Sequence, residues 1–397
     1  MPQSQVPAVT PSAMRAVNRR LLWDSLGSTE SSTRPQLARA TGLSLPTVTA
    51  ALAELEQVGL VRSLGRHETP LGRPAEMFEA DASVGFAVGV DIGRAWIRVA
   101  LADLTGNIIF RSNLRNDAGR PSTLVDLIDK AITQTIAEAD VDPHLVAHTV
   151  IGSPGVYNAS QGLVRYAANI PEWERAGMGT TLAQRLSGSS TIDNDANLAA
   201  IGEHAHGAGR GMRHFVYAHV GTGVGLGLIL DGQLYNGALG AAGEAGFLPI
   251  GDRPGPETPR PARGMLEERV AADAVVRYSR ECGLAADSAE AVFAAARAGD
   301  ARAIAAVTRE AEQLALLLVS IAALLDPELI VLGGAIGRNL DLLEADMCSA
   351  IARISPLTPV FGVGELADEA VLRGALTIGV TRAKDAVFAR RTAVLNQ

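Results

Sequence analysis

The sequence predicts an α/β protein in which a small helix-turn-helix module precedes a body of two lobes. Three short helical patterns and then the start of a strand with a basic turn occupy the first 80 residues. A strand, a glycine turn and a second strand follow at 86–101, and the same pattern recurs at 215–230. Strand and helix patterns alternate over the rest of the chain, which is typical of α/β folds. The duplicated pattern predicts two lobes of similar design with a cleft between them.

The composition is that of a folded protein with more than one domain. The chain has 397 residues, of which 47% are hydrophobic, enough for two or three domains with cores of their own. No apolar run reaches the length of a membrane span, and the N-terminal residues lack the hydrophobic region of a signal peptide. The two cysteines are far apart in the sequence, which favours a reducing compartment. We therefore expect a cytoplasmic protein with no membrane partner.

The predicted module is a winged helix-turn-helix at 13–80, which follows a flexible tail at 1–12. Three helices are expected, at 13–26, 33–40 and 45–58. Thr33 and Ser44 are placed to cap the second and third of them, and Gly42 lies in the turn between. Apolar residues recur at helical spacing in the first and third helices. The expected buried positions are Val17, Leu21 and Leu22 in the first helix and Val48, Leu52 and Leu55 in the third.

Charge and turn chemistry predict that this module binds DNA. Residues 14–73 contain eight arginines and five acidic residues, although the whole chain has a net charge of −8. In a helix-turn-helix the second helix of the pair enters the major groove by its N-terminal residues, and a basic wing can contact phosphate. A three-helix module for protein interaction is the alternative. The expected DNA contacts are Arg34, Ser44, Pro46, Thr47, Thr49, Arg62, Arg66 and Arg73.

A dense polar cluster marks the predicted junction between a strand and a helix near position 195. Four of the five residues at 193–197 are Asp or Asn. One such residue suffices to cap a helix, so we expect the cluster to bind the vicinal hydroxyls of a polyol. A helix cap without a ligand is the alternative.

Two glycine-rich turns follow predicted strands, and glycine lets a backbone approach phosphate closely. Glycine is also the default residue of hairpin turns, so each turn alone is a weak signal. A third strand ends at Ser153-Pro154-Gly155, which can also abut a ligand. The expected phosphate contacts are Gly221, Thr222, Gly223, Gly333 and Gly334.

Together these motifs resemble the ROK family, which comprises repressors, open reading frames and sugar kinases. The resemblance extends from the helix-turn-helix to about residue 389. Its markers are the segments 153–155, 194–197, 221–223, 243–246 and 332–334. It implies a two-lobed actin-like, ribonuclease H-like fold. Lobe 1 would span 84–194, lobe 2 would span 195–370, and a helix at about 371–389 would return to pack on lobe 1.

The resemblance also implies roles for residues of the cleft. In a family kinase Asp195 would be the base that deprotonates the attacking sugar hydroxyl. The residues implied to contact the sugar are Gly155, Asn194, Asp195, Glu244 and Glu267.

The chain departs from the family kinases in its first phosphate loop. These kinases carry Asp-x-Gly-Gly-Thr, whereas this chain has Asp91-Ile92-Gly93-Arg94-Ala95. An arginine at the second glycine position would crowd the place of the γ-phosphate, and the threonine hydroxyl is missing. Because phosphoryl transfer depends on positioning, we expect kinase activity to be lost.

The chain also lacks the zinc ligands of the family. The positions of the three family cysteines hold Thr258, Arg260 and Met265, and the histidine position holds Phe247. The other histidines do not have partners at zinc spacing. We therefore expect neither a metal site nor another cofactor.

The sequence thus predicts a sugar-responsive transcriptional regulator, a repressor of genes for carbohydrate uptake or metabolism. We expect it to bind a palindromic operator as a homodimer or homotetramer and to take a sugar or sugar phosphate into the cleft. Two alternatives remain open. One is an active ATP-dependent sugar kinase that carries a DNA-binding module, and the other is a regulator controlled by a phosphotransfer protein.

Overall fold

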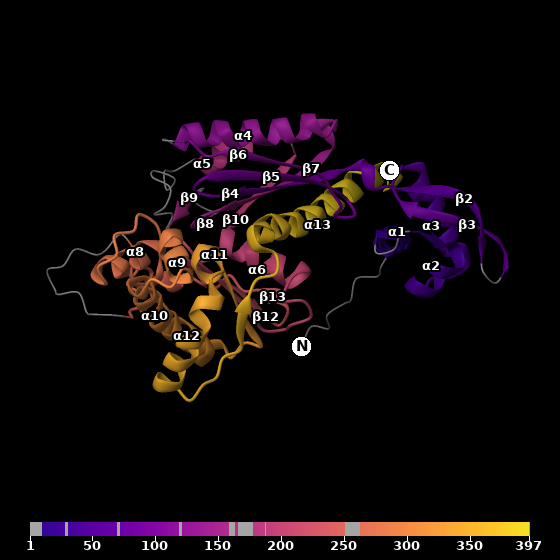
Figure 1. The fold of residues 1–397 in the computed structure, drawn as a ribbon. Coiled ribbons are helices and arrows are strands. Elements are labelled where there is room, and N and C mark those ends of the chain that lie inside the picture. The colour runs from indigo at the N-terminus through magenta and orange to yellow at the C-terminus, as the bar shows by residue number, and fades with distance from the viewer. Residues whose placement is uncertain are drawn as a thin grey trace, which may run out of the picture.

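The chain folds into a helical module and two α/β lobes, in the order that the sequence predicts (Figure 1). The structure is a computed structural model. It describes residues 10–27, 31–69, 72–118, 121–158, 163–165, 178–186, 188–250 and 263–396.

The N-terminal module is a helix-turn-helix followed by a β-hairpin. Its elements are α1 (Pro11–Gly27), β1 (Ser32–Thr33), α2 (Arg34–Thr41), α3 (Leu45–Gln57), β2 (Val61–Thr69) and β3 (Gly72–Ala80). Thr33 caps α2 in a capping box with Gln36, and the Ser44 side chain accepts a hydrogen bond from the backbone N–H of Thr47 at the start of α3. Both predicted caps are confirmed. Gly42 has φ 72°, which makes the turn between the paired helices.

The core of the module confirms the predicted face of α3 and only one of the three predicted positions of α1. Val48, Leu52 and Leu55 are fully buried, as predicted. In α1 the prediction is wrong for Val17 and Leu21, whose exposed fractions are 52% and 44%. Leu22 is buried, as predicted, and the other buried residues of α1 are Arg19, Trp23 and Leu26. The reason is that α1 packs on two sides, against α3 and against the C-terminal helix, which rotates its buried face by about one residue.

Lobe 1 is a five-stranded mixed sheet covered by helices on both faces. The strand order is β10-β7-β4-β5-β6. The strands are β4 (Phe86–Ile92), β5 (Trp96–Asp103), β6 (Ile108–Arg115), β7 (Val146–Ser153) and β10 (Ser189–Asn194). Helix α4 (Pro121–Glu138) covers one face, and α13 (Ala370–Thr392) packs on β4 and β7 from the other. Because both faces are covered, all seven residues of β4 are buried.

Lobe 2 repeats this plan with a second five-stranded sheet in the order β13-β12-β11-β14-β15. The strands are β11 (Phe215–Val220), β12 (Val224–Leu230), β13 (Gln233–Leu234), β14 (Leu329–Gly333) and β15 (Phe361–Val363). Four helices form the largest core with it, namely α8 (Ala272–Glu281), α9 (Ala289–Arg297), α10 (Ala301–Leu325) and α12 (Leu340–Ile354).

Both lobes also contain shorter elements. Those before lobe 2 are β8 (Val156–Asn158), β9 (Leu163–Arg165) and α5 (Met178–Arg185), and those within lobe 2 are α7 (Glu267–Val270) and α11 (Gly334–Gly337).

Two helices cross at the centre and connect the lobes. Helix α6 (Asp195–His206) leaves β10 of lobe 1 and packs on β11 and β12 of lobe 2, while α13 returns from lobe 2 to lobe 1. Their backbones touch where Gly202 faces Gly374. A Cβ atom on Gly374 would lie 1.8 Å from the carbonyl oxygen of Leu198, and one on Gly202 would lie 2.2 Å from that of Ala370. The absence of side chains at these two positions therefore permits the crossing.

Helix α13 continues beyond lobe 1 to the N-terminal module (Figure 1). The ring of Phe388 stacks on Trp23 of α1 with 5.4 Å between centroids, and Asp385 pairs with Arg20 at 2.7 Å. This helix covers the segment in which the sequence predicts a C-terminal helix, and it packs on β4 and β7 of lobe 1. Among the described residues no helix is both long and apolar enough to cross a membrane.

Candidate functional site

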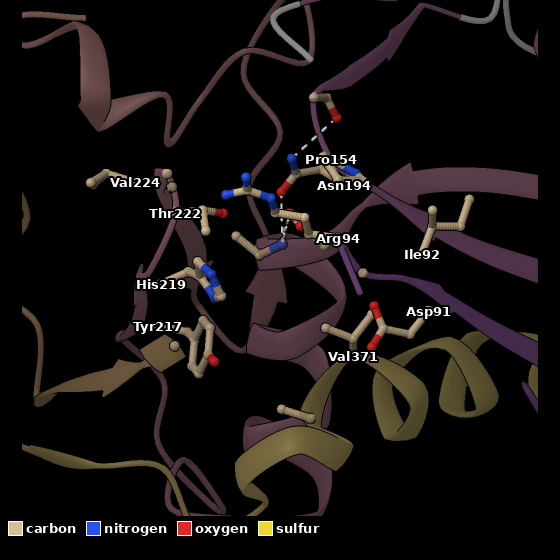
Figure 2. A pocket seen from close by; sticks show the side chains of 18 of the residues that line it. Asp91, Ile92, Arg94, Pro154, Asn194, Tyr217, His219, Thr222, Val224 and Val371 are labelled. Atoms are coloured by element: carbon tan, nitrogen blue, oxygen red, sulfur yellow. Dashed lines mark hydrogen bonds between the residues drawn. The ribbon is translucent and has the colours of Figure 1, made fainter. Parts of the chain in front are cut away.

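A cavity of about 250 Å³ lies between the two lobes, where β4, β7 and β10 of lobe 1 and β11 of lobe 2 end (Figure 2). This is the edge at which α/β sheets present loops and helix N-termini to ligands. All five residues expected to contact sugar line it, namely Gly155, Asn194, Asp195, Glu244 and Glu267. The structure thus brings the predicted set together from both lobes, while their individual roles stay predictions.

Asn194 is both a helix cap and a lining residue of the cavity. Its Oδ1 accepts hydrogen bonds from the backbone N–H groups of Ala196 and Asn197, at 2.9 and 3.2 Å, which caps α6. Its Nδ2 donates to the carbonyl oxygen of Gly155 at 3.1 Å. Asn194 therefore caps a helix, as one interpretation of the polar cluster expects, and also lines the cavity, where the other interpretation expects a polyol. Among the described residues, the second N–H of this amide has no acceptor, so it is available to a ligand.

Asp195 and Glu244 are two carboxyl groups of the cleft whose pKa values are strongly raised. Burial raises the pKa of Asp195 to about 6. Burial, followed by the charges of Asp195 and Glu267, raises the pKa of Glu244 to about 7. Near neutral pH each group can therefore occur with or without its proton, so it can donate or accept a hydrogen bond. This versatility suits sugar hydroxyls, which do both.

Glu267 is held by an arginine whose role the sequence interpretation missed. Nε of Arg263 donates to Glu267 at 2.6 Å and Nη1 to Asp273 at 2.8 Å, while Nη2 donates to the carbonyl oxygen of Thr222. Arg263 therefore fixes the Glu267 carboxylate against the turn after β11. The spacing of four residues between Arg263 and Glu267 is the signal that would have indicated this pair.

The glycine turns lie beside the cavity but contribute unequally. Thr222, Gly223 and Gly334 line it, whereas Gly221 and Gly333 are not among its lining residues. Gly333 has a packing role, because a Cβ atom there would lie 2.0 Å from the phenol oxygen of Tyr217.

Tyr217 and His219, which the sequence interpretation did not single out, form one wall of the cleft (Figure 2). They are alternate residues of β11, so both side chains leave the same face of the sheet. Burial lowers the pKa of His219 and raises the pKa of Tyr217, so both rings are uncharged at neutral pH.

Strands β4 and β5, the turn between them and the residues before α13 supply the charged residues of another part of the wall. Nη1 of Arg98 donates to Asp91 at 3.0 Å, and its Nη2 lies 4.0 Å from Asp368. Burial raises the pKa of Asp91 to about 6, although Arg98 opposes the shift. Arg94 is exposed, and its side chain is directed into the cleft on the side of Thr222 (Figure 2). The arginine in place of the family glycine is therefore part of the cleft.

The described part of the chain contains no set of side chains arranged to bind a metal ion. No group of three or more His, Cys, Asp or Glu residues is arranged there to hold a metal ion. Phe247, at the family histidine position, is 39% exposed. Thr258 and Arg260, at two of the cysteine positions, lie outside the described residues.

The start of α3 presents an exposed surface to solvent. Ser44, Pro46 and Thr49 are exposed, and Thr47 is half-buried. The Ser44 and Thr47 hydroxyls are 2.8 Å apart, while the Thr49 hydroxyl donates to the carbonyl oxygen of Leu45. Small polar residues at this end are what a recognition helix requires.

The predicted arginines of the module differ in their availability to DNA. Arg34 pairs with Glu76 at 2.6 Å and lies over the Phe78 ring at 4.5 Å, so it connects α2 to the wing. Arg62 pairs with Glu79 across the hairpin. Arg66 is exposed on the wing. The side chain of Arg73 lies outside the described residues.

Comparison with known proteins gives matches to regulators and to kinases. Residues 87–381 match the model of the ROK family. The chain is 28% identical over 254 residues to the xylose repressor of Bacillus spizizenii, covering 64% of this chain and 65% of the repressor. It therefore spans slightly less than two thirds of that relative. It is also 31% identical over 270 residues to the glucokinase of Thermotoga maritima, covering 64% of this chain and 84% of the kinase.

Solved structures confirm the fold. A crystal structure of a ROK family transcriptional regulator, a homolog of the E. coli MLC protein, matches with a TM-score of 0.74 at 20% identity. That match covers 95% of this chain and 98% of the other. The glucokinase of Streptomyces griseus, solved with glucose and AMPPNP, matches with a TM-score of 0.64 at 25% identity over 75% of this chain and 100% of the kinase. The two-lobed architecture is thus shared with both kinds of protein.

Proposed function

This chain belongs to the ROK family, and from that premise we propose that it is a sugar-responsive, DNA-binding transcriptional regulator. We further propose that it represses genes for carbohydrate uptake or metabolism, as the names of similar xylose repressors suggest. The observation that carries the proposal is the course of α13. Ala370 and Val371 at its start line the cleft, and Phe388 near its end packs on the module.

The module would bind DNA through the exposed start of α3 and through the wing. Ser44, Pro46 and Thr49 would approach base edges in the major groove, while Arg66 would contact backbone phosphate. The partner would be a palindromic operator, bound by a homodimer or by a homotetramer. The distance between the two modules in such an assembly would set the half-site spacing.

The cleft would take the sugar between the lobes. Glu244, Asp195 and Glu267 would accept hydrogen bonds from its hydroxyls, and the free N–H of the Asn194 amide would donate one. Because these groups come from both lobes, a bound sugar would favour a closed arrangement. The sugar would shift the equilibrium between open and closed states, and with it the position of the module. The size of that shift is set by how much more tightly the sugar binds the closed state than the open one.

The decisive experiment measures binding to the DNA upstream of the chain's own gene, at fixed salt, with a panel of sugars and sugar phosphates. We expect specific binding that one member of the panel relieves. The Glu244→Ala variant should keep the DNA affinity and lose the response to the effector. Specific binding that no sugar relieves in the wild type would favour control by a phosphotransfer protein instead, and no specific binding would contradict the proposal.

An active sugar kinase is the second candidate, because Asp195 lies in the cleft and glucokinases are among the similar proteins. Arg94 opposes it, since it lines the cleft at the position where family kinases carry a glycine of the phosphate loop. A coupled assay of ATP consumption over the same sugars separates the two. Turnover that Asp195→Asn abolishes would establish the kinase, and no turnover in the wild type would remove this candidate.

A further inference from the structure

A second cavity, of about 300 Å³, lies where the N-terminal module meets lobe 1. Its walls come from α1, from residues 80–82 at and after the end of β3, from the turn between β5 and β6, and from α13. Among the described residues, it shares no lining residue with the interlobe cleft. Ligand pockets usually measure roughly 300–1,000 Å³, so this one suits a molecule about as small as an amino acid.

The cavity lies across residues 81–85, which connect β3 of the module to β4 of lobe 1. On the module side, the backbone N–H of Asp81 donates to the carbonyl oxygen of Leu60 at 3.0 Å. On the lobe side, the backbone N–H of Leu104 donates to the carbonyl oxygen of Ala82 at 3.3 Å. A molecule in the cavity would therefore contact both sides of the connection, and it would favour one orientation of the module.

Part of the wall is apolar, and part of its charge is already neutralised. Trp23 and Leu104 line the cavity and are almost fully buried. The indole N–H of Trp23 donates to the Leu60 carbonyl oxygen at 3.2 Å, so its ring offers apolar contact area rather than a further hydrogen bond. Of the four charged side chains on the wall, Arg20 and Asp24 pair with each other at 2.8 Å.

Lys384 and Asp81 are the other two charged residues of the wall, and neither joins an ion pair within the described part of the chain. The Lys384 ammonium group lies beside the C-terminal end of α1, since a Cβ atom on Gly27 would be 3.4 Å from its Nζ. The helix dipole favours a cation there without neutralising it. Oδ1 of Asp81 accepts hydrogen bonds from the backbone N–H and the hydroxyl of Ser83, at 3.0 and 2.6 Å. Its Oδ2 has no donor among the described residues.

We propose that this cavity binds a small zwitterion with an apolar side chain, of the class of the apolar α-amino acids. Its carboxylate would pair with Lys384 and its ammonium group with Oδ2 of Asp81, while its side chain would pack against Trp23 and Leu104. Pairing with such a ligand would offset the free-energy cost of leaving two half-buried charges unpaired. The site goes beyond the proposed function, and in a regulator it would be a second input that acts on the module directly.

Calorimetric titration of the full chain with matched sets of ligands tests the site. Each set contains an amino acid, the carboxylic acid that lacks its amino group, and the amine that lacks its carboxylate. The sets are leucine with 4-methylpentanoate and 3-methylbutylamine, and phenylalanine with 3-phenylpropanoate and 2-phenylethylamine. We expect at least one of the two amino acids to bind. Each of its two analogues should bind at least about 10-fold more weakly, because each loses one charge-assisted contact.

Two substitutions remove the charges while keeping the shape of the wall. Lys384→Met keeps most of the aliphatic chain, and Asp81→Asn keeps an oxygen atom for Ser83. Each should weaken the amino acid by about 10- to 100-fold. In Lys384→Met the amino acid should bind no better than the amine, and in Asp81→Asn no better than the carboxylic acid, a pattern that loss of structure would not produce. Arg382→Gln, an exposed cation of α13 outside the cavity, is the matched control and should change the affinity by less than about 2-fold.

The proposal would be overturned if neither amino acid binds, or if neither substitution reduces the affinity. It would also be overturned by an affinity that is lost in Glu244→Ala and retained in Lys384→Met, since the ligand would then occupy the interlobe cleft.

Operator titrations distinguish failure of this site from failure of the proposed function. In a regulator the bound amino acid should change the operator affinity in the wild type and not in Lys384→Met. Amino acid binding through Lys384 without any specific operator binding would keep the site and reject the regulator. Operator binding that a sugar relieves, in a chain that binds neither amino acid, would keep the regulator and reject the site.

Discussion

Among individual residues, the buried carboxyl groups of the cleft determine its chemistry, because burial raises their pKa values and no cation pairs with two of them. Asp195 and Glu244 lie in the cleft at pKa values of about 6 and 7, against ordinary values of 3.8 and 4.5. Arg263 is committed to Glu267 and Arg98 to Asp91, so neither cation pairs with these two acids. A ligand with hydroxyl groups would supply the hydrogen bonds that the protein itself does not.

The raised pKa of Glu244 predicts how stability depends on pH. The folded chain retains the Glu244 proton up to about pH 7, whereas the unfolded chain releases it near pH 4.5. The native state therefore binds more protons in this window, and the free energy of unfolding falls as pH rises through it. In Glu244→Gln this part of the decline should disappear, which we expect to amount to roughly 1–3 kcal/mol after screening by solvent. Urea unfolding of both proteins at pH 5 and pH 8 measures it, and equal declines would contradict the assignment.

Sequence reasoning predicted the cleft residues well where a motif is local. Asn194 and Asp195 are adjacent in the sequence, and the strand-to-helix junction alone places them at the edge of a sheet. Arg263 was missed because its importance comes from Thr222 and Asp273, which only the fold brings to it. Tyr217 and His219 were missed because polar residues within an apolar strand give no local signal of the face they line.

At the scale of elements, the crossing of α6 and α13 depends on glycines that allow direct backbone contact. Gly374→Ala would place a Cβ atom 1.8 Å from the Leu198 carbonyl oxygen, so the helices would have to separate. We expect a loss of about 3 kcal/mol or more in the free energy of unfolding. Gly379→Ala on the same helix is the matched control, because its Cβ atom would lie 3.3 Å from that of Ala87. That contact is tight but far less severe than one at 1.8 Å, so we expect the control to change the free energy of unfolding by no more than about 1 kcal/mol in either direction, because the gain in helix propensity offsets local strain.

Urea denaturation of the two glycine variants tests the crossing directly. A Gly374→Ala protein as stable as Gly379→Ala would mean that the helices are not in backbone contact.

The hairpins at β4–β5 and β11–β12 could be predicted from the sequence because strand, turn and strand are contiguous. The buried face of α1 could not, because Trp23 packs against Phe388, which belongs to the last helix of the chain.

In the whole molecule, α13 is connected at both of its ends, to α6 near its start and to α1 of the module near its end. Near its start, Glu203 of α6 accepts hydrogen bonds from the backbone N–H groups of Glu365 and Leu366, and from that of Ala208. These bonds fix the chain that leads from lobe 2 into α13. Near its end, Asp385 and Phe388 contact α1. A change in the angle between the lobes would therefore move the module, because a helix transmits displacement along its axis.

Phe388→Ala tests whether α13 couples the cleft to the module. The substitution removes the stack on Trp23 while leaving the cleft intact, so the affinity for the effector in the absence of DNA should change by less than about 2-fold. The effect of the effector on operator affinity should shrink, from the 5- to 150-fold typical of allosteric coupling toward no effect. Arg382→Ala, an exposed position on the same helix, should keep the full response. Operator titrations with and without effector, on variants whose melting shows a folded chain, measure the coupling. A Phe388→Ala protein with an undiminished response would show that the signal reaches the module by another route. Residues 81–85, which connect β3 of the module to β4 of lobe 1, would then be the segment to vary.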